Sequence, residues 1–147
     1  MDTEEVPAVQ ALLREYAGGV GVPLDFQDFD REVAELPGAY AAPRGALLVA
    51  HVAGELAGCV ALRPLDGDAC EMKRLFVRAS ARGSGLGEHL ALAIVAEARR
   101  LGYRRMRLDT LPSMGAAQSL YERLGFRDIA PYTGNPVAGT RFLELLL

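Results

Sequence analysis

A glycine-rich turn, Arg82-Gly83-Ser84-Gly85-Leu86-Gly87, is the stretch of this sequence with the clearest capacity for chemistry. It follows an apolar run that ends at Val77 and precedes a helical pattern that begins near Leu86. A helix that starts in such a turn leaves its first backbone N–H groups without intrahelical partners, at the positive end of the helix dipole. Glycines have no Cβ, so a ligand can approach this backbone closely. The turn therefore predicts a binding site for phosphate oxygens.

Other phosphate-binding motifs fit this turn poorly. No Gly-Lys-Ser or Gly-Lys-Thr is present, which argues against a Walker A loop. A dinucleotide fingerprint that starts at Gly83 requires glycine at its sixth position, where Glu88 stands. The strands expected upstream also form a hairpin rather than the opening of a β-α-β unit. The common nucleotide-binding folds are therefore poor candidates.

Hydrophobic periodicity predicts the elements that position the turn. Two helices are expected first, from Thr3 to a stop at Gly18-Gly19 and from Asp28 to Leu36, joined by a loop over residues 21–27 that could cover a site. The later segments are then strands 46–52, 56–62 and 69–77, a helix from Leu86 to Gly102, strand 106–110, helix 114–124, and strands 126–129 and 141–147. A strand, a crossover helix and a second strand suggest a parallel pair with a right-handed connection. The pattern predicts a three-layer α/β/α domain of the α+β class around a mixed sheet.

Composition limits the class of protein. A chain of 147 residues predicts one domain, residues 1–147, and its net charge of -3 argues mildly against a nucleic-acid partner. No apolar run approaches the roughly 20 residues that span a bilayer, so no membrane partner is expected. Cys59 and Cys70 lie in apolar runs, and no basic, apolar leader precedes them, so we expect buried, reduced thiols in a cytoplasmic protein. Neither cysteine has a ligand-spaced partner, so no metal site is expected. The lone histidines His51 and His89 are expected to be structural or exposed.

The turn resembles a known family motif when it is taken together with a later block. Its Arg-x-x-Gly-x-Gly pattern, at Arg82, Gly85 and Gly87, resembles the acetyl-CoA-binding motif of the GNAT superfamily of N-acetyltransferases. The block Leu120-Tyr121-Glu122-Arg123-Leu124-Gly125-Phe126 resembles the family's second half-signature, at the expected separation. The motif-level match covers residues 71–126, and the element order matches over the whole chain. The resemblance implies a GNAT-like fold whose mixed sheet is splayed at the strand that binds acetyl-CoA.

The resemblance also implies which residues bind acetyl-CoA, the cosubstrate. Backbone N–H groups from Arg82 to Gly87, a range that includes Gly83, Ser84, Gly85 and Leu86, hold the pyrophosphate in this family. Backbone groups of Leu75, Phe76 and Val77 pair with the pantetheine arm, while their side chains are expected to pack in the core. Many members have an asparagine at the position of Met114. Ser113 beside it could supply a hydrogen bond instead.

Amine attack on a thioester requires a general base, because an alkyl ammonium has a pKa of about 10.4. Glu71 stands eleven positions before Arg82, where some family members carry a catalytic glutamate; the alternative is a solvated carboxylate at a strand end. A backbone N–H near Leu75 is the expected donor to the oxyanion. Tyr121 matches the tyrosine that faces the coenzyme sulfur, and a phenol with a pKa near 10 can donate a proton. Its alternative is a core role, because it belongs to an apolar helical stripe.

The acceptor is not readable from the sequence: a small molecule or a protein could supply the amine. A late Tyr-x-x-Asn-Pro segment, with Tyr132 and Asn135, is shared with a branch of small bacterial GNAT proteins and could contact the acceptor. Turn chemistry explains Asn135 equally well. The final apolar strand, residues 142–147, could cover a sheet edge or pair across a homodimer.

Three hypotheses follow for the function. The first is an N-acetyltransferase that moves the acetyl group of acetyl-CoA to a primary amine through a tetrahedral intermediate. The second is a non-catalytic acyl-CoA-binding module or sensor, which Met114 and the open identity of the base allow. The third is a nucleotide-binding module. Stabilisation by coenzyme A, ATP and NAD, together with acylation of an amine panel, would separate them.

Overall fold

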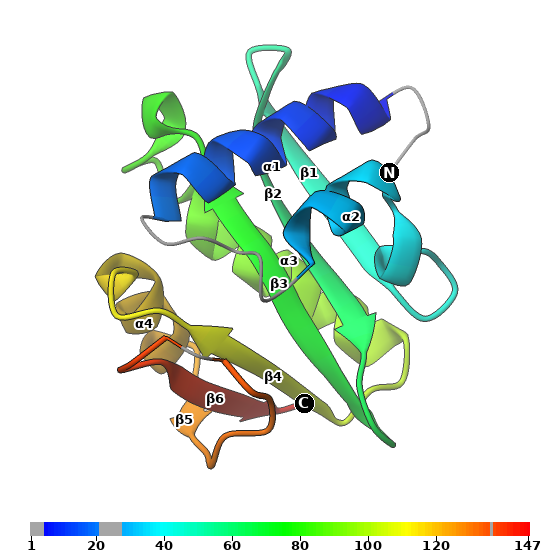
Figure 1. Cartoon of the computed structure of the whole chain (residues 1–147), viewed down its shortest axis with the longest axis vertical. Helices are drawn as coiled ribbons and strands as arrows, with labels where there is room; N and C mark the ends of the chain where they lie inside the picture. The colour runs from blue at the N-terminus through cyan, green and yellow to red at the C-terminus, as the bar shows by residue number, and fades with distance from the viewer. Residues whose placement is uncertain (1–4, 21–27, 136) are drawn as a thin grey trace.

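The computed structural model, which describes residues 5–20, 28–135 and 137–147, contains a six-stranded mixed sheet between two helical layers (Figure 1). Helices α1 and α2 cover one face of the sheet, and α3 and α4 lie behind it (Figure 1). The helices are α1 (Val6–Val20), α2 (Phe29–Ala34), α3 (Leu86–Arg100) and α4 (Gly115–Arg123), with short 3₁₀ turns at Gly38–Tyr40 and Ala79–Ala81. The strands are β1 (Ala46–Val52), β2 (Glu55–Pro64), β3 (Ala69–Val77), β4 (Arg105–Thr110), β5 (Arg127–Asp128) and β6 (Arg141–Leu146). The predicted three-layer α+β architecture is confirmed.

The sheet has the order β1-β2-β3-β4-β6-β5 and changes character at its centre. Strands β1, β2 and β3 form an antiparallel meander, whereas β3 and β4 are parallel and are joined by α3. Pairing of β3 with β4 is confined to Ala69–Glu71 against Arg105–Arg107, and beyond it the two strands diverge (Figure 1). The predicted splay of the sheet at this strand is therefore confirmed.

A β-bulge bends β3 where the two strands separate. Arg74 and Leu75 of β3 lie opposite the single residue Val60 of β2, and Arg74 has a φ of 61°. This is the left-handed region, which non-glycine residues seldom adopt. The Cys59 thiol of β2 donates a hydrogen bond to the Arg74 carbonyl oxygen at 3.3 Å, which satisfies the displaced backbone group. A bulge of this kind disrupts the ladder and increases the local twist of the strand.

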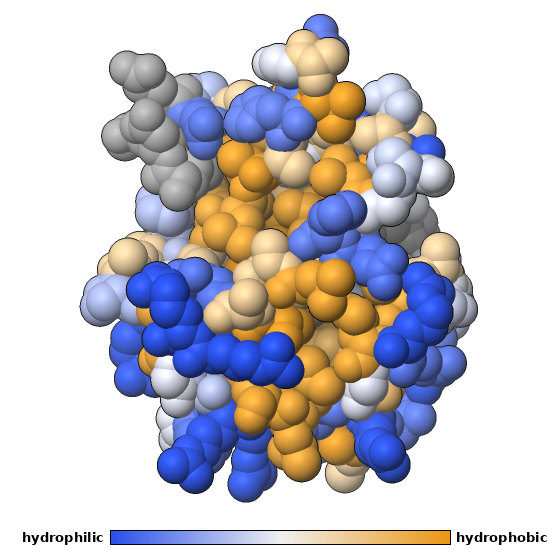
Figure 2. Space-filling view, turned by 180° about the vertical axis from the view of Figure 1, so that it is seen from behind, coloured by the Kyte–Doolittle hydropathy of each residue, from blue (hydrophilic) through white to orange (hydrophobic). Residues whose placement is uncertain are grey.

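Each face of the sheet has its own apolar core. The core on the α3 side includes Leu62, Ile94, Met106, Leu108 and Leu143, and the core on the α1 side includes Val9, Leu12, Leu13, Val33 and Cys59. Both cysteines are buried and free, as expected. Viewed from behind the sheet, apolar side chains gather near the middle of the surface and hydrophilic ones surround them (Figure 2). The helices are thus held by burial of their apolar stripes rather than by helix propensity alone.

The sequence-based boundaries are wrong at one helix end. Helix α1 continues through Gly18-Gly19 to Val20, because a helical glycine costs only about 1 kcal/mol and the buried apolar face outweighs that cost. The loop expected at residues 21–27 lies outside the described residues. Strand β6 covers the outer edge of β4 over six residue pairs, and β5 then pairs with β6 over two. Within the described ranges, no helix is long and apolar enough to cross a membrane.

Replacement of Ile94 by alanine tests the core on the α3 side. The Ile94 side chain is fully buried, so we expect Ile94→Ala to lower the free energy of unfolding by about 2–5 kcal/mol. Leu92 lies on the same helix but is 50% exposed, and Leu92→Ala should change it by no more than about 0.5 kcal/mol. Urea denaturation followed by circular dichroism measures both. Equal losses in the two variants would contradict the assigned faces of α3.

Candidate functional site

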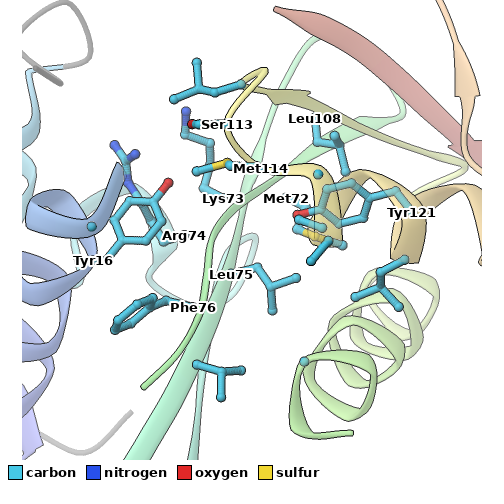
Figure 3. Close-up of a pocket in the computed structure, with 18 of the residues that line it drawn as sticks. Tyr16, Met72, Lys73, Arg74, Leu75, Phe76, Leu108, Ser113, Met114 and Tyr121 are labelled. Atoms are coloured by element: carbon cyan, nitrogen blue, oxygen red, sulfur yellow. The ribbon is translucent and has the colours of Figure 1, made fainter. Parts of the chain in front are cut away.

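A cavity of about 410 Å³ lies where β3 and β4 diverge, and we call it the β3–β4 cavity (Figure 3). One end is bordered by the glycine turn through Arg82 and Gly87, and the wall continues to Asp109 of β4. The remaining wall consists of Tyr16 and Gly19 of α1, residues 72–77 of β3, Leu108, Leu111, residues 113–117, Leu120, Tyr121 and Asn135. The cavity therefore connects the two sequence motifs that are separated by more than thirty residues.

The glycine turn leaves the start of α3 open. Gly83 and Gly85 have φ values of 83° and 81°, and a side chain in this region would strain the backbone. Gly85 is the N-cap of α3 and supplies no side-chain cap. The first intrahelical bond runs from the His89 N–H to the Gly85 carbonyl at 3.1 Å. The N–H groups of residues 86–88 thus have no intrahelical acceptor and can bind anionic oxygens.

The end of β3 offers backbone groups to the cavity. Leu75 and Val77 are packed against the core on the α3 side, whereas Phe76 packs on the α1 side. The β2-facing edge of this segment is paired, but among the described residues its β4-facing edge has no strand partner. Arg82 lies across this end of the strand, with its Nε donating to the Val77 carbonyl at 3.0 Å. An extended ligand could therefore occupy the place of a neighbouring strand.

Tyr121 of α4 directs its hydroxyl into the β3–β4 cavity (Figure 3). The ring is buried and packs against Phe126 with centroids 5.6 Å apart. Burial raises the pKa of Tyr121 above its usual value, and the charges of Tyr16 and Asp109 add to this effect. Among the described residues, none is hydrogen-bonded to its hydroxyl. Tyr121 is thus a protonated phenol at neutral pH with its donor directed at the cavity.

Tyr16 borders the same cavity from the opposite side, on α1 (Figure 3). Its ring packs edge-on against Phe76, with centroids 5.7 Å apart, and against Phe29 at 6.5 Å. Burial raises the pKa of Tyr16, although a hydrogen bond and the charge of Arg74 oppose the shift. The cavity is therefore flanked by two protonated phenols.

A second, smaller cavity of about 100 Å³ adjoins the first, and we call it the charged cavity. Four residues line both cavities and so form the boundary between them: Lys73, Arg74, Asp109 and Asn135. The rest of its wall consists of Glu32, Arg63, Glu71, Thr133 and Gly134. Its lining therefore includes three cations and three carboxylates.

Glu71 lies in the charged cavity rather than in the β3–β4 cavity. Its side chain is 2% exposed, and both of its oxygens accept hydrogen bonds. The Arg63 Nε donates to one oxygen at 2.8 Å, and the Tyr132 hydroxyl donates to the other at 2.6 Å. Burial, followed by the charge of Glu71, raises the pKa of Tyr132, which therefore remains a hydrogen-bond donor. These contacts place Glu71 and Tyr132 in one unit beside the β3–β4 cavity.

Two further ion pairs border the charged cavity. The Lys73 Nζ lies 3.8 Å from Asp109 Oδ1, and Asn135 Nδ2 donates to Asp109 Oδ2 at 2.9 Å. Burial lowers the pKa of Lys73, although the charges of Glu71 and Asp109 oppose the shift. Arg74 forms two hydrogen bonds with Glu32, at 2.8 and 3.0 Å. Within the described ranges, no group of His, Cys, Asp or Glu side chains is arranged to hold a metal ion.

Most residues predicted from the sequence meet at the β3–β4 cavity: Leu75, Phe76, Val77, Arg82, Gly87, Ser113, Tyr121 and Asn135. The other turn residues, Gly83 to Leu86, lie between Arg82 and Gly87 and do not line the cavity wall. Sequence reasoning missed Tyr16, Lys73, Arg74 and Asp109. A signal existed for the charged ones, because Lys73-Arg74 and Asp109 interrupt apolar strands. Tyr16 belongs to an ordinary apolar helix stripe and carries no such signal.

Known proteins are similar to this chain over most of its length. The model described as "Acetyltransferase (GNAT) family" matches residues 7–126. An uncharacterised N-acetyltransferase of Schizosaccharomyces pombe is 38% identical over 144 residues, which cover 97% of this chain and 88% of the relative. An acetyltransferase of Bacillus subtilis solved in complex with CoA is 26% identical, with a TM-score of 0.61 over 71% of this chain and 78% of that one. An acetyltransferase of Streptococcus agalactiae, 21% identical, shares the fold with a TM-score of 0.80 over 100% of this chain and 94% of that one.

Substitution of Gly87 tests the turn as a binding site for coenzyme A. A Cβ at Gly87 would meet Val77 Cγ2 at an ordinary 3.8 Å, so Gly87→Val should fold while it places a side chain over the open N–H groups. We expect at least about a tenfold loss of affinity, measured by isothermal titration calorimetry with coenzyme A, which corresponds to about 1.4 kcal/mol. Gly85 is a poorer test position, because its φ of 81° makes any side chain there strained.

Ala93→Val is the matched control for this experiment. Ala93 is exposed on the same helix, outside the cavity, so its replacement should leave the affinity for coenzyme A unchanged. Unaltered binding by Gly87→Val would mean that the turn does not contact the coenzyme.

Proposed function

The chain belongs to the acetyltransferase (GNAT) family and is an acetyl-CoA-dependent acyltransferase, and on this premise we propose that it acetylates a primary amine by direct attack on the thioester. One observation carries the proposal. A single cavity extends from the open start of α3 to the Tyr121 hydroxyl, which has no hydrogen-bond partner among the described residues. The binding site for the phosphates and a proton donor for the leaving thiolate are thus connected.

The chain's own backbone supplies most of the contacts to acetyl-CoA in this proposal. The N–H groups of residues 86–88, beside Arg82, bind the pyrophosphate at the positive end of α3. The unpaired edge of β3 from Leu75 to Val77 binds the pantetheine arm, as a neighbouring strand would. Ser113, which lines the cavity, is proposed to contribute its side-chain hydroxyl to the coenzyme.

Acetyl transfer then requires removal of a proton from the amine, stabilisation of the oxyanion and protonation of the leaving thiolate. The amine nitrogen attacks the thioester carbonyl after it loses a proton, and Glu71 is the proposed acceptor of that proton, through its contact network with Tyr132 or through water. The Leu75 N–H stabilises the oxyanion of the tetrahedral intermediate. As the C–S bond breaks, the Tyr121 hydroxyl gives its proton to the thiolate. Burial keeps the phenol protonated until that moment.

Replacement of Tyr121 by phenylalanine tests the acid. We expect turnover to fall by about 10²–10⁴-fold, because the thiolate loses its proton donor, while coenzyme A affinity stays within about twofold. Release of free thiol during acetylation of an amine panel measures the rate, and calorimetry measures the affinity. Tyr103→Phe is the control, since this tyrosine is buried and donates to the Arg44 carbonyl outside both cavities. Full activity in Tyr121→Phe would exclude Tyr121 as the acid, and no acetylation by the unaltered chain would favour a binding module.

Replacement of Glu71 by glutamine tests the base. Glu71→Gln should lower turnover at neutral pH by about 10²–10⁴-fold. Part of the rate should return at alkaline pH, where a larger fraction of the acceptor amine is neutral without help from the protein. Glu144 forms a comparable pair with Arg107 at 2.7 Å but lies outside both cavities, so Glu144→Gln should keep the unaltered pH–rate profile. A Glu71→Gln profile that matches the unaltered chain would assign proton removal to another group.

A further inference from the structure

We infer, on the basis of the proposed function, that the charged cavity binds the carboxylate of the acceptor, so that the acceptor is a small amine with a nearby carboxylate, such as a free α-amino acid. In the proposed function the coenzyme occupies the β3–β4 cavity and leaves the charged cavity to the acceptor. It is small, closely bordered by charges of both signs, and adjoins the place where acyl transfer occurs. These properties describe the acceptor rather than the donor.

The position of the charged cavity follows from the direction of β3. In the proposed function the coenzyme phosphates bind near Arg82 and Gly87, beside the Val77 end of the strand. Residues of a strand advance by about 3.3 Å each, so Lys73 and Arg74 lie roughly 10–13 Å further along, toward the acyl end. These two residues, with Asp109 and Asn135, are the wall shared by both cavities. A molecule in the charged cavity therefore adjoins the acyl end and not the phosphates.

Arg63 is the side chain best placed to bind a carboxylate there. Its Nε donates to Glu71, whereas its two terminal nitrogens have no hydrogen-bond acceptor among the described residues. The side chain is 40% exposed and lines the cavity. A guanidinium with two parallel N–H donors matches a carboxylate in both geometry and charge. Arg74 does not take this role, because its Nε and Nη2 already donate to the two carboxylate oxygens of Glu32, at 2.8 and 3.0 Å.

Lys73 and Asp109 complete the site for a molecule that carries both charges. The Lys73 ammonium lies 3.8 Å from Asp109, longer than a direct hydrogen bond, and adds a second cation beside Arg63. Asp109 lines both cavities, so its carboxylate can orient the acceptor nitrogen toward the thioester. An α-amino acid has one carbon between its nitrogen and its carboxylate, which fits a site whose cations and anions are adjacent. A lysine side chain of a protein brings an apolar stem and no anion, so it would leave these cations without a new partner.

The test compares L-amino acids with their own amides as acceptors of the full chain at saturating acetyl-CoA, with free thiol release as the readout. Each pair shares its side chain and amine, and only the carboxylate differs. We expect kcat/KM to favour the free acid by about tenfold or more, as loss of one charge-assisted contact predicts. The α-amine of an amino-acid amide is less basic than that of the free acid, so a larger fraction of it is neutral and able to attack. This difference in basicity favours the amide and therefore works against the expected preference for the free acid. Equal or faster acetylation of the amides would overturn the inference while the proposed acetyltransferase function stands.

Two other outcomes are separable in the same assay. Acetylation of polyamines but of neither member of any pair would overturn the inference alone. Absence of acetylation of every amine would overturn the proposed function and, with it, the inference.

The variant Arg63→Lys separates recognition from support of Glu71. It keeps a cation beside Glu71 but removes the paired donors, so KM for the amino acid should rise about tenfold more than KM for the matched amide, because any effect on Glu71 is common to both acceptors. The control is Arg105→Lys, an exposed residue 3.6 Å from Asp68 and outside both cavities. An equal effect on both acceptors would mean that Arg63 only supports Glu71, and it would overturn the inference.

Discussion

The end of the β3–β4 ladder is the constraint on which the rest of this structure depends. Two parallel strands joined by a crossover helix would normally pair along their length, but here the pairing stops at Glu71 and Arg107. A left-handed residue, Arg74, and the extra residue of the bulge follow within four positions. The open edge costs backbone hydrogen bonds that the protein could otherwise form. In the proposed function, an extended ligand that occupies the gap recovers that cost.

The partly buried ion pair between Arg74 and Glu32 holds the bulge in its place. The Arg74 guanidinium lies 5.0 Å from the Phe29 ring centroid and 5.8 Å from that of Tyr16, so two aromatic rings also pack against it. Removal of two charges from water is costly, and only a close, two-point pair with further contacts offsets the cost. Because Glu32 and Phe29 belong to α2 and Tyr16 belongs to α1, this pair also holds both N-terminal helices against β3 beside the β3–β4 cavity.

Much of the fold was predictable because its signals are local. The period-2 runs of β1 and β3 have the predicted limits, and α3 begins at Leu86 as its glycine turn indicates. The errors also have physical causes. Gly18-Gly19 does not end α1, since packing of Val9, Leu12 and Leu13 outweighs the low propensity of two glycines. Tyr16 resembled any apolar helix position, and its contact with the cavity depends on how α1 crosses the sheet.

The sequence by itself determined the donor side of this protein. The strand, the glycine turn and the helix start are contiguous, so their backbone groups are placed by local geometry, whatever the rest of the chain does. Only the tertiary structure decided the charged cavity, which is the proposed acceptor site. The charged cavity is lined from five separate parts of the chain, which meet because the sheet order places them together. They are α2 with Glu32, β2 with Arg63, β3 with Glu71, β4 with Asp109, and the segment before β6 with Asn135. The physical reason is that Coulomb and hydrogen-bond interactions depend on distance in space, and no spacing along the chain encodes that distance for residues so far apart.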